Sequence, residues 1–336
     1  MSASMRFMDH LDARVLGRHR GLGEFAARVG GTPLIALPAE PGSARIFAKC
    51  EWENPSGTVK DRVAFAMVYA FLRDLGEGDS ARAHLLEYTG GSLGLSLSKL
   101  CRRLGIPLTL VAGSFLPAAA AAELGADGTE LDLVDKEKGF YAVIERAREL
   151  ARLHPDWTLL YQHGNPANPW IHRETTGREL VGQLEAAGVP RLDAWVASIG
   201  TGGSLIGVYE AARARFPDLR LYATTPAEQP YASPLPGNGL PKFAGSGGLG
   251  DGRRQGFVAA YDEKVERHFH YSYRESLDAV RVFAERTGLR IGTSAAANLA
   301  AARQVAREVG EGGCVATIFP SLATKDEWAK CQEAAS

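Results

Sequence analysis

Lys60 is the residue best placed for covalent chemistry in this sequence. It lies in the first turn of a helix predicted over 58–75, just after Ser56, a plausible N-cap. Residues 63–72 carry no charge, so this helix is predicted to be buried. A lysine beside such an apolar surface is partly desolvated, which lowers its pKa and makes the neutral amine available for a Schiff base. The same pattern also permits a lysine that reaches water from the helix end.

A glycine-rich loop gives the second chemical signal. It joins a predicted strand to a predicted helix and consists of Gly200, Thr201, Gly202, Gly203 and Ser204. Glycines let the backbone approach an anion closely, and a helix N-terminus adds free N–H groups and a favourable dipole. The loop contains no lysine or arginine, and its spacing matches neither a Walker loop nor a dinucleotide-binding fingerprint. A plain strand-to-helix turn remains an equal interpretation.

Taken together and in order, these segments resemble the β-family of pyridoxal-phosphate enzymes (fold type II). That family includes cysteine synthase, also called O-acetylserine sulfhydrylase, and cystathionine β-synthase. The resemblance covers about residues 30–301. Three further motifs carry it: Gly31-Thr32-Pro33-Leu34, the run Gln162-His163-Gly164-Asn165-Pro166-Ala167-Asn168-Pro169, and Gly292-Thr293-Ser294-Ala295-Ala296.

The resemblance implies a role for several of these residues. Lys60 would hold pyridoxal 5'-phosphate as an imine, and its freed amine would be the general base for the substrate α-proton. The 200–204 loop would bind the phosphate, Ser294 the pyridine nitrogen, and Gln162 the substrate carboxylate. A serine rather than a carboxylate at the ring nitrogen favours rapid loss of a β-leaving group. That loss gives an aminoacrylate, to which a nucleophile can add.

The substrate loop departs from the family pattern T-S-G-N-T-G. Here the matching residues are Thr89, Gly90, Gly91, Ser92, Leu93 and Gly94. The first four are expected to bind the substrate, and Ser92 also the cofactor. Ser92 offers one hydroxyl where the family has an asparagine amide. The segment that begins with Glu87, just upstream, resembles the corresponding segment of the tryptophan synthase β-subunit, whose loop is also glycine-rich.

We therefore expect a transferase of amino-acid biosynthesis that performs β-replacement on an O-activated L-serine. The altered loop leaves room for a non-standard substrate or nucleophile. Two alternatives stay open: a lyase that performs β-elimination, like serine or threonine dehydratase or cysteine desulfhydrase, and a non-catalytic binding protein that retains the fold. The presence of Lys60 argues against the second alternative, because a pure scaffold does not need this lysine.

The elements that must position these residues alternate between strand and helix. Short apolar runs such as 84–87, 108–112 and 193–199 precede helical patterns, which predicts parallel sheets covered on both faces. The helix over 94–104 has leucines along one stripe and a glycine stop. Ser272 and Glu275 form a capping-box pattern. A glycine-rich loop is expected over 234–256.

The expected fold is α/β, with two three-layer αβα domains of the tryptophan synthase β-subunit type. The smaller domain is expected over 45–168, with the Schiff-base lysine and the substrate loop. The larger is expected over 1–44 and 169–336, with the phosphate loop. The resemblance implies that the cofactor lies in the interdomain cleft and that the protein is a homodimer.

Composition excludes several classes of protein. The chain has 38 basic and 39 acidic residues, so it lacks the positive charge that nucleic-acid binding requires. We expect no membrane segment, since proline and glycine interrupt the longest uncharged run, and no signal peptide, since the N-terminus has no continuous apolar segment behind a basic start. Four scattered cysteines indicate a reducing cytoplasm. His268 and His270 would share one face of a strand, but a metal site needs a third ligand and none is expected.

Overall fold

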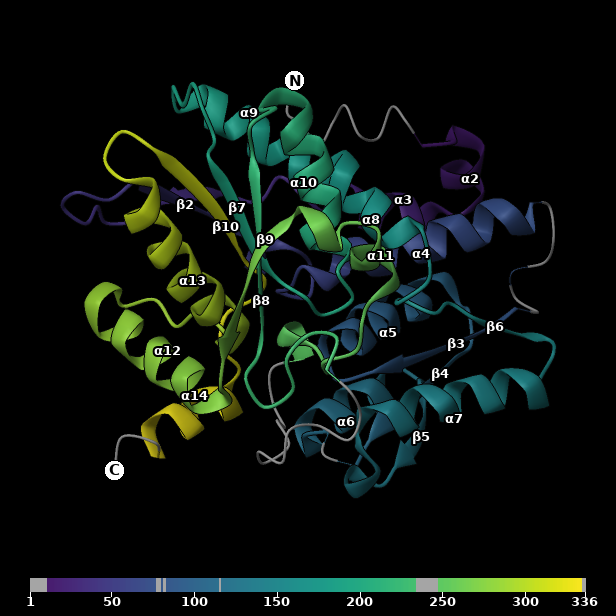
Figure 1. The fold of residues 1–336 in the computed structure, drawn as a ribbon. Helices are drawn as coiled ribbons and strands as arrows, with labels where there is room; N and C mark the ends of the chain where they lie inside the picture. The colour runs from purple at the N-terminus through teal and green to yellow at the C-terminus, as the bar shows by residue number, and fades with distance from the viewer. Residues whose placement is uncertain (1–10, 77–79, 81–82, 115, 234–246, 334–336) are drawn as a thin grey trace. The chain divides into compact units, whose positions relative to one another are not determined.

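The computed structural model describes residues 11–76, 80, 83–114, 116–233 and 247–333 (Figure 1). The chain divides into two compact units. The described residues of unit 1 lie in 11–29, 54–56 and 60–168. Those of unit 2 lie in 30–53, 57–59 and 169–333.

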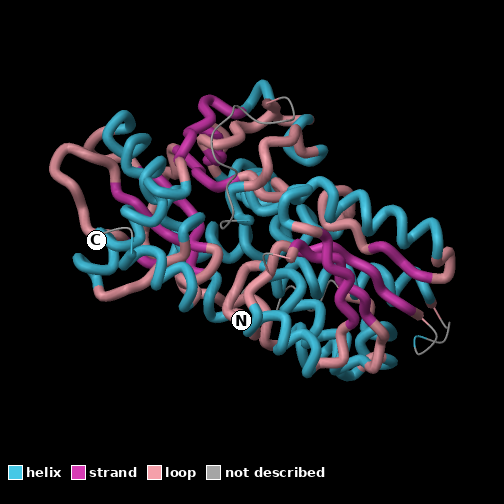
Figure 2. The backbone as a smooth tube through the Cα atoms, turned by 90° about the horizontal axis from the view of Figure 1, so that it is seen from below, coloured by secondary structure: helices cyan, strands magenta, loops and turns pink. Residues whose placement is uncertain are grey.

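Unit 1 is built on a four-stranded parallel sheet in the order β5-β4-β3-β6. Its strands are β3 (His84–Thr89), β4 (Leu108–Gly113), β5 (Glu130–Val134) and β6 (Trp157–Leu159). The two central strands, β3 and β4, are almost wholly buried, as expected of parallel strands covered on both faces. Figure 2 shows this sheet as a magenta fan with helices above and below it.

The helices of unit 1 cover both faces of its sheet. One face packs against α7, and the other against α5, which in turn contacts α3, α4 and α6. These helices are α2 (Ala13–Arg18), α3 (Arg20–Ala26), α4 (Lys60–Leu75), α5 (Ser92–Leu104), α6 (Ala118–Ala126) and α7 (Gly139–Leu153). A short helix, α8 (Ala167–Ile171), crosses the boundary between the units in sequence.

Unit 2 has a six-stranded sheet in the order β1-β2-β10-β7-β8-β9, parallel except for β1. Its strands are β1 (Leu34–Ala36), β2 (Arg45–Cys50), β7 (Ala194–Ser198), β8 (Arg220–Pro226), β9 (Val265–Tyr271) and β10 (Cys314–Phe319). Its helices are α9 (Arg178–Ala186), α10 (Gly203–Arg215), α11 (Gly256–Ala259), α12 (Tyr273–Thr287), α13 (Thr293–Val309) and α14 (Lys325–Glu333). α13 lies on one face of the sheet, and α9 and α10 on the other.

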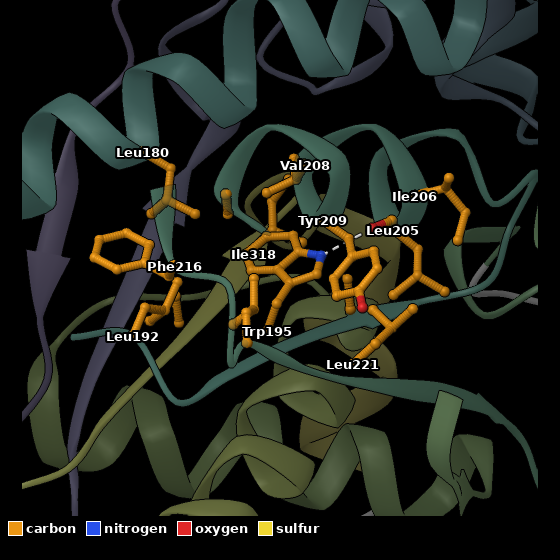
Figure 3. Packing of buried hydrophobic residues seen from close by; sticks show 14 of the residues in the cluster. Leu180, Leu192, Trp195, Leu205, Ile206, Val208, Tyr209, Phe216, Leu221 and Ile318 are labelled. Carbon is orange, nitrogen blue, oxygen red and sulfur yellow. Dashed lines mark hydrogen bonds between the residues drawn. The ribbon is translucent and has the colours of Figure 1, made fainter. Parts of the chain in front are cut away.

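A buried tryptophan fastens α10 to the sheet. Trp195 of β7 lies at the centre of an apolar cluster that includes Leu205, Val208 and Ile318 (Figure 3). Its indole Nε1 donates a hydrogen bond to the carbonyl oxygen of Leu205, 3.0 Å away, in the first turn of α10. This bond and the packing around it fix the start of α10 against β7.

A π-helix packs closely on α10 through glycine. The π-helix spans His172–Gly177. A Cβ added to Gly207 of α10 would lie 2.3 Å from the carbonyl oxygen of Pro169 and 2.8 Å from Cβ of His172. Only glycine allows this approach, and π-helical turns are often found at functional sites.

The α/β class and most of the predicted elements are confirmed. The capping box of Ser272 and Glu275 is present at the start of α12, and Gly288 ends that helix in the left-handed conformation. The predicted helix over 58–75 begins instead at Lys60, because residues 58 and 59 pair with the segment that follows β10. Most of the loop expected over 234–256 lies outside the described residues.

The division into units differs from the expected one at three places, one of which is residues 57–59, which belong to unit 2. Residues 45–50 form β2, which pairs with β1 and β10 and so belongs to the sheet of unit 2, not to the smaller domain. Residues 11–29 belong to unit 1, because α2 and α3 pack on α4 and α5. Both divisions change at residue 168. Among the described helices, none combines the length and the apolar character needed to span a membrane.

Candidate active site

Lys60 is the first residue of α4, in unit 1. Its side chain is half-buried, at the start of a helix in which residues 61–69 are all buried. This burial lowers the pKa of Lys60 to about 8. The cause is desolvation, which disfavours the charged ammonium. The amine is therefore neutral far more often near pH 7 than an exposed lysine would be.

The segment before Lys60 does not form the expected N-cap. Ser56 does not cap α4 with its side chain. Instead its backbone N–H donates to the Asp61 carboxylate, with 2.6 Å between Ser56 N and Asp61 Oδ2. Asp61 is fully buried, and this burial raises the pKa of its carboxyl. Asp61 is thus a structural residue that holds the chain before α4, not an ordinary first-turn charge.

The loop from Thr89 to Gly94 connects β3 to α5. Thr89 Oγ1 accepts hydrogen bonds from the backbone N–H groups of Gly91 at 2.9 Å and Gly94 at 3.0 Å. Gly91 has φ +146°, and Cβ at Gly94 would lie 2.7 Å from Thr89 Cγ2, so glycine is required at both positions. Ser92 is exposed, and the N-cap residue Gly91 has no side chain to cap α5. Thr89 already occupies the N–H of Gly94, so the N–H groups that precede it in the first turn are the ones that can hold a carboxylate.

Gln162 lies at the same edge of the unit 1 sheet as this loop. β3 and β6 are neighbouring parallel strands, and both the 89–94 loop and Gln162 follow their carboxyl ends. Gln162 is buried, and its Nε2 donates to the carbonyl oxygen of Tyr88 at 3.0 Å. The fold therefore brings Gln162 close to the end of β3, while Lys60 begins a helix that packs on α5.

Glu87 and Tyr88 are further polar groups at this edge. Both side chains are fully buried. Tyr88 Oη lies 2.6 Å from His163 Nδ1, and the two rings are stacked with centroids 5.5 Å apart. Burial raises the pKa of Glu87 to about 8, against the opposing effect of hydrogen bonds from Gln162 and its neighbours. Glu87 therefore keeps its proton at neutral pH.

The loop from Gly200 to Ser204 lies in unit 2, between β7 and α10. Gly202 precedes the helix with φ +86°, and as the N-cap residue it has no side chain to cap α10. Thr201 Oγ1 accepts a hydrogen bond from the N–H of Gly203 at 3.3 Å. The thirteen-residue helix α10 thus begins in a glycine turn. This geometry suits a phosphate dianion.

The segment 250–258 packs closely against this loop. A Cβ at Gly250, which has φ +85°, would lie 2.2 Å from the carbonyl oxygen of Ile199. A Cβ at Gly202 would lie 2.4 Å from Cγ2 of Val258. The backbone of the loop is therefore in close contact with this segment on two sides, and the contacts restrict its conformation.

Ser294 lies in the first turn of α13, also in unit 2. The backbone N–H of Gly292 donates to the carbonyl oxygen of Ser321, which follows β10. Asn298 of α13 accepts from Thr224 Oγ1 at 2.6 Å and donates to the carbonyl oxygen of Ile318 at 3.0 Å. These bonds tie the start of α13 to β8 and β10, on either side of β7. Ser294 and the 200–204 loop therefore lie at one carboxyl edge of the unit 2 sheet.

Comparison with known proteins identifies the family. The model of the pyridoxal-phosphate dependent enzymes matches residues 26–321. The chain is 32% identical to a cysteine synthase of Staphylococcus aureus (strain Mu50 / ATCC 700699) over 299 residues, 87% of this chain and 91% of that one.

The chain belongs to the family of pyridoxal-phosphate dependent enzymes.

Two solved structures are also similar to this family member. An O-acetylserine dependent cystathionine β-synthase from Helicobacter pylori superposes with a TM-score of 0.79 and 26% identity, over 90% of this chain and 95% of that one. An O-ureido-L-serine synthase superposes with a TM-score of 0.77 and 25% identity, over 92% of this chain and 98% of that one.

The residues of this pyridoxal-phosphate enzyme fit the cofactor. The donor groups match the chemistry of both ends of the molecule: unit 1 has a lysine with a lowered pKa for the aldehyde, and unit 2 has a glycine turn at a helix N-terminus for the phosphate. Unit 1 therefore offers a covalent partner and unit 2 an anion site, the two kinds of group that the cofactor requires.

Sequence reasoning gave no role to two residues of the site. Glu87 is the only acidic residue in β3, and an isolated acidic residue in an apolar strand is the feature of the sequence that could have indicated a functional role. Gly250 lies among many other glycines, so its contact with Ile199 could not be found without the fold.

Proposed function

We propose that this chain catalyses pyridoxal-phosphate-dependent β-replacement on an O-activated L-serine. Lys60 carries this proposal: it is the lysine expected from the family motif, and it begins a buried helix with a pKa lowered to about 8. The similarity to a cysteine synthase over 87% of the chain supports the reaction class.

In this proposal each residue has a defined task. When bound, pyridoxal phosphate supplies the electron sink for chemistry at the substrate α-carbon. Lys60 holds the cofactor and then moves the α-proton at its Nζ. The N–H groups of the 200–204 loop hold the phosphate, and the Ser294 hydroxyl faces the pyridine nitrogen. The segment from Thr89 through Ser92, which leads into α5, and Gln162 hold the substrate carboxylate.

Product analysis tests the reaction. The purified protein is given O-acetylserine, O-phosphoserine, serine or cysteine, each with sulfide or a second nucleophile, and products are identified by mass spectrometry. We expect a new amino acid that contains the nucleophile, formed only with an O-activated serine and lost in Lys60→Ala. Pyruvate and ammonia without any added nucleophile would identify β-elimination instead. No reaction and no cofactor binding would contradict the enzyme proposal.

We further propose a homodimer in the cytoplasm. The four cysteines are free and buried, and burial raises the pKa of the Cys101 thiol to about 12, which fits a reducing compartment. The dimer rests on the family resemblance. Light scattering should give twice the 36.0 kDa chain mass, and a value equal to one chain would contradict it.

A further inference from the structure

Glu87 is a buried carboxyl with one unsatisfied oxygen. Its side chain is fully buried in β3, between Leu86 and Tyr88, which are also fully buried. Its Oε2 has no hydrogen-bond partner among the described residues. Burial of a polar atom without a partner costs free energy, and the cost is larger for a charged group. A carboxyl retained in such a place calls for a reason beyond packing.

The other oxygen of Glu87 faces Gln162. Oε1 lies 3.4 Å from the backbone nitrogen of Gln162 and 3.5 Å from its side-chain Nε2. Both hydrogen bonds are long, so each is weak. Glu87 therefore contacts a side chain that the family resemblance assigns to the substrate carboxylate, and it holds that side chain only loosely.

The path of the chain explains this contact. The β3–β6 ladder ends with the hydrogen bond from the N–H of Leu160 to the carbonyl oxygen of Leu86. Tyr161 then adopts φ +57°, a left-handed conformation that is rare for an aromatic residue and turns the chain away from β3. The N–H of Gln162 consequently has no backbone acceptor on β3, and the Glu87 side chain takes the place of one.

The turn that carries Gln162 is held by several other bonds. Asn165 Nδ2 donates to the carbonyl oxygen of Leu160, and Asn168 Nδ2 donates to the carbonyl oxygen of Gln162, each at 2.9 Å. The Arg148 guanidinium donates to Tyr161 Oη at 2.6 Å and lies over the Tyr161 ring. The backbone of the turn therefore does not depend on the two weak bonds to Glu87.

The orientation of the Gln162 amide follows from its neighbours. The Tyr88 carbonyl oxygen can only accept, so the Gln162 atom 3.0 Å from it must be the nitrogen. One amide hydrogen is thereby committed to Tyr88. The second faces Glu87 Oε1, and it is the hydrogen that could bind a substrate carboxylate.

We propose that Glu87 is a positioning residue that controls whether the second amide hydrogen of Gln162 is available to the substrate carboxylate. A neutral Glu87 accepts weakly and leaves this hydrogen to the substrate. An ionised Glu87 competes for it and also repels the substrate carboxylate. This inference rests on the proposed function, in which Gln162 binds that carboxylate.

The surroundings of Glu87 favour the neutral form at physiological pH. Burial raises the pKa of Glu87 to about 8. Its partner in the β4 register is Leu110, and α7 covers the opposite face of β3. On the face of β3 that carries Glu87, α4 has the charged residues Lys60, Arg62 and the buried Asp61. The basic residues of α5 on this side each form an ion pair with an acidic residue: Lys99–Glu123, Arg102–Asp127 and Arg103–Glu24.

The test compares wild type with Glu87→Gln in the cofactor-loaded enzyme from pH 6 to 10. Glutamine keeps the shape and stays neutral, so it mimics the protonated acid. We expect the wild-type KM for the amino-acid donor to rise about tenfold per pH unit above pH ~8, relative to Glu87→Gln, while kcat changes little. Titration of Lys60 and of the substrate amine cancels in this ratio, because both proteins share them.

Two further measurements keep the proposal falsifiable if Glu87→Gln folds poorly. Wild type without substrate should show the infrared band of a protonated carboxyl at pH 7, and this band should disappear on ionisation above pH ~8. In Gln162→Ala, the alkaline rise in KM should be smaller than in wild type, because only the repulsion between Glu87 and the substrate carboxylate remains. A pH-independent KM ratio, or no protonated carboxyl at pH 7, would overturn the role of Glu87. Failure to bind any amino acid would instead overturn the proposed function.

Discussion

At the scale of single residues, the same cause brings the pKa values of two ionisable groups of unit 1 closer to neutral pH. Desolvation lowers the pKa of Lys60 and raises that of Glu87, each to about 8. Neither has an opposite charge that outweighs its burial. Perturbed groups of this kind cluster at functional sites, because covalent and proton-transfer chemistry needs pKa values near the working pH.

The protonation of Glu87 should make the free energy of unfolding depend on pH. The folded chain keeps this proton up to pH ~8, whereas the unfolded chain loses it near pH ~4.5. Between these values the folded state binds more protons, so the free energy of unfolding should fall by about 1.4 kcal/mol per pH unit as pH rises. Urea unfolding at pH 5, 6, 7 and 8 should show this extra slope in wild type but not in Glu87→Gln. Equal slopes in the two proteins would mean that Glu87 ionises normally.

At the scale of elements, the phosphate loop depends on how α10 and the segment 250–258 pack. Trp195 fixes the start of α10 (Figure 3). The backbone of Gly250 lies against Ile199. The loop itself contains no cationic side chain, so it binds an anion only if its N–H groups are correctly oriented. Its affinity for a phosphate should therefore respond to packing beyond the loop.

Gly250→Ala tests that dependence. The new Cβ would lie 2.2 Å from the Ile199 carbonyl oxygen, and the left-handed φ of +85° would add strain. We expect the affinity for pyridoxal phosphate to fall at least about tenfold, roughly 1.4 kcal/mol, measured by absorbance titration. Gly256→Ala is the matched control, because a Cβ there meets nothing within 4 Å. Equal affinities in the two variants would contradict this account of the loop.

The sequence predicted those elements whose pattern is local. The leucine stripe of α5, the buried runs of β3 and β4 and the capping box of α12 all express periodicity or a short-range hydrogen bond. It did not predict the start of α4, which is set by pairing of residues 58 and 59 with the segment after β10. Nor did it predict that β6 ends at Leu159, shortly before Tyr161 turns the chain in the left-handed conformation.

The candidate site likewise contains residues that the sequence predicted and contacts that it did not. Lys60, Gln162 and the 200–204 loop could be found because their motifs are contiguous in the sequence. The contact of Glu87 with Gln162 joins residues 75 positions apart. The contact of Gly250 with Ile199 likewise depends on a segment that has no helical or strand period. Such contacts follow from the fold and not from local pattern.

At the scale of the whole molecule, each unit contributes one kind of chemistry. Unit 1 supplies the amine of Lys60 and the polar groups at the ends of β3 and β6. Unit 2 supplies the glycine turn of α10 and the serine of α13. The loop after β3 and Gln162 lie at the carboxyl edge of the unit 1 sheet, and the glycine turn and Ser294 at that of the unit 2 sheet, where α/β proteins usually bind their ligands. The family's cofactor has an aldehyde and a phosphate, which these two sets suit.

The central claim is that Lys60 carries the cofactor, and one measurement tests it directly. The purified protein is loaded with pyridoxal phosphate, reduced with borohydride and digested, and the modified peptide is identified by mass spectrometry. We predict one covalent label, on Lys60, and an absorption band that is lost in Lys60→Ala but kept in Lys99→Ala, a lysine on the surface of α5. A label on another lysine, or no label after loading, would contradict the account.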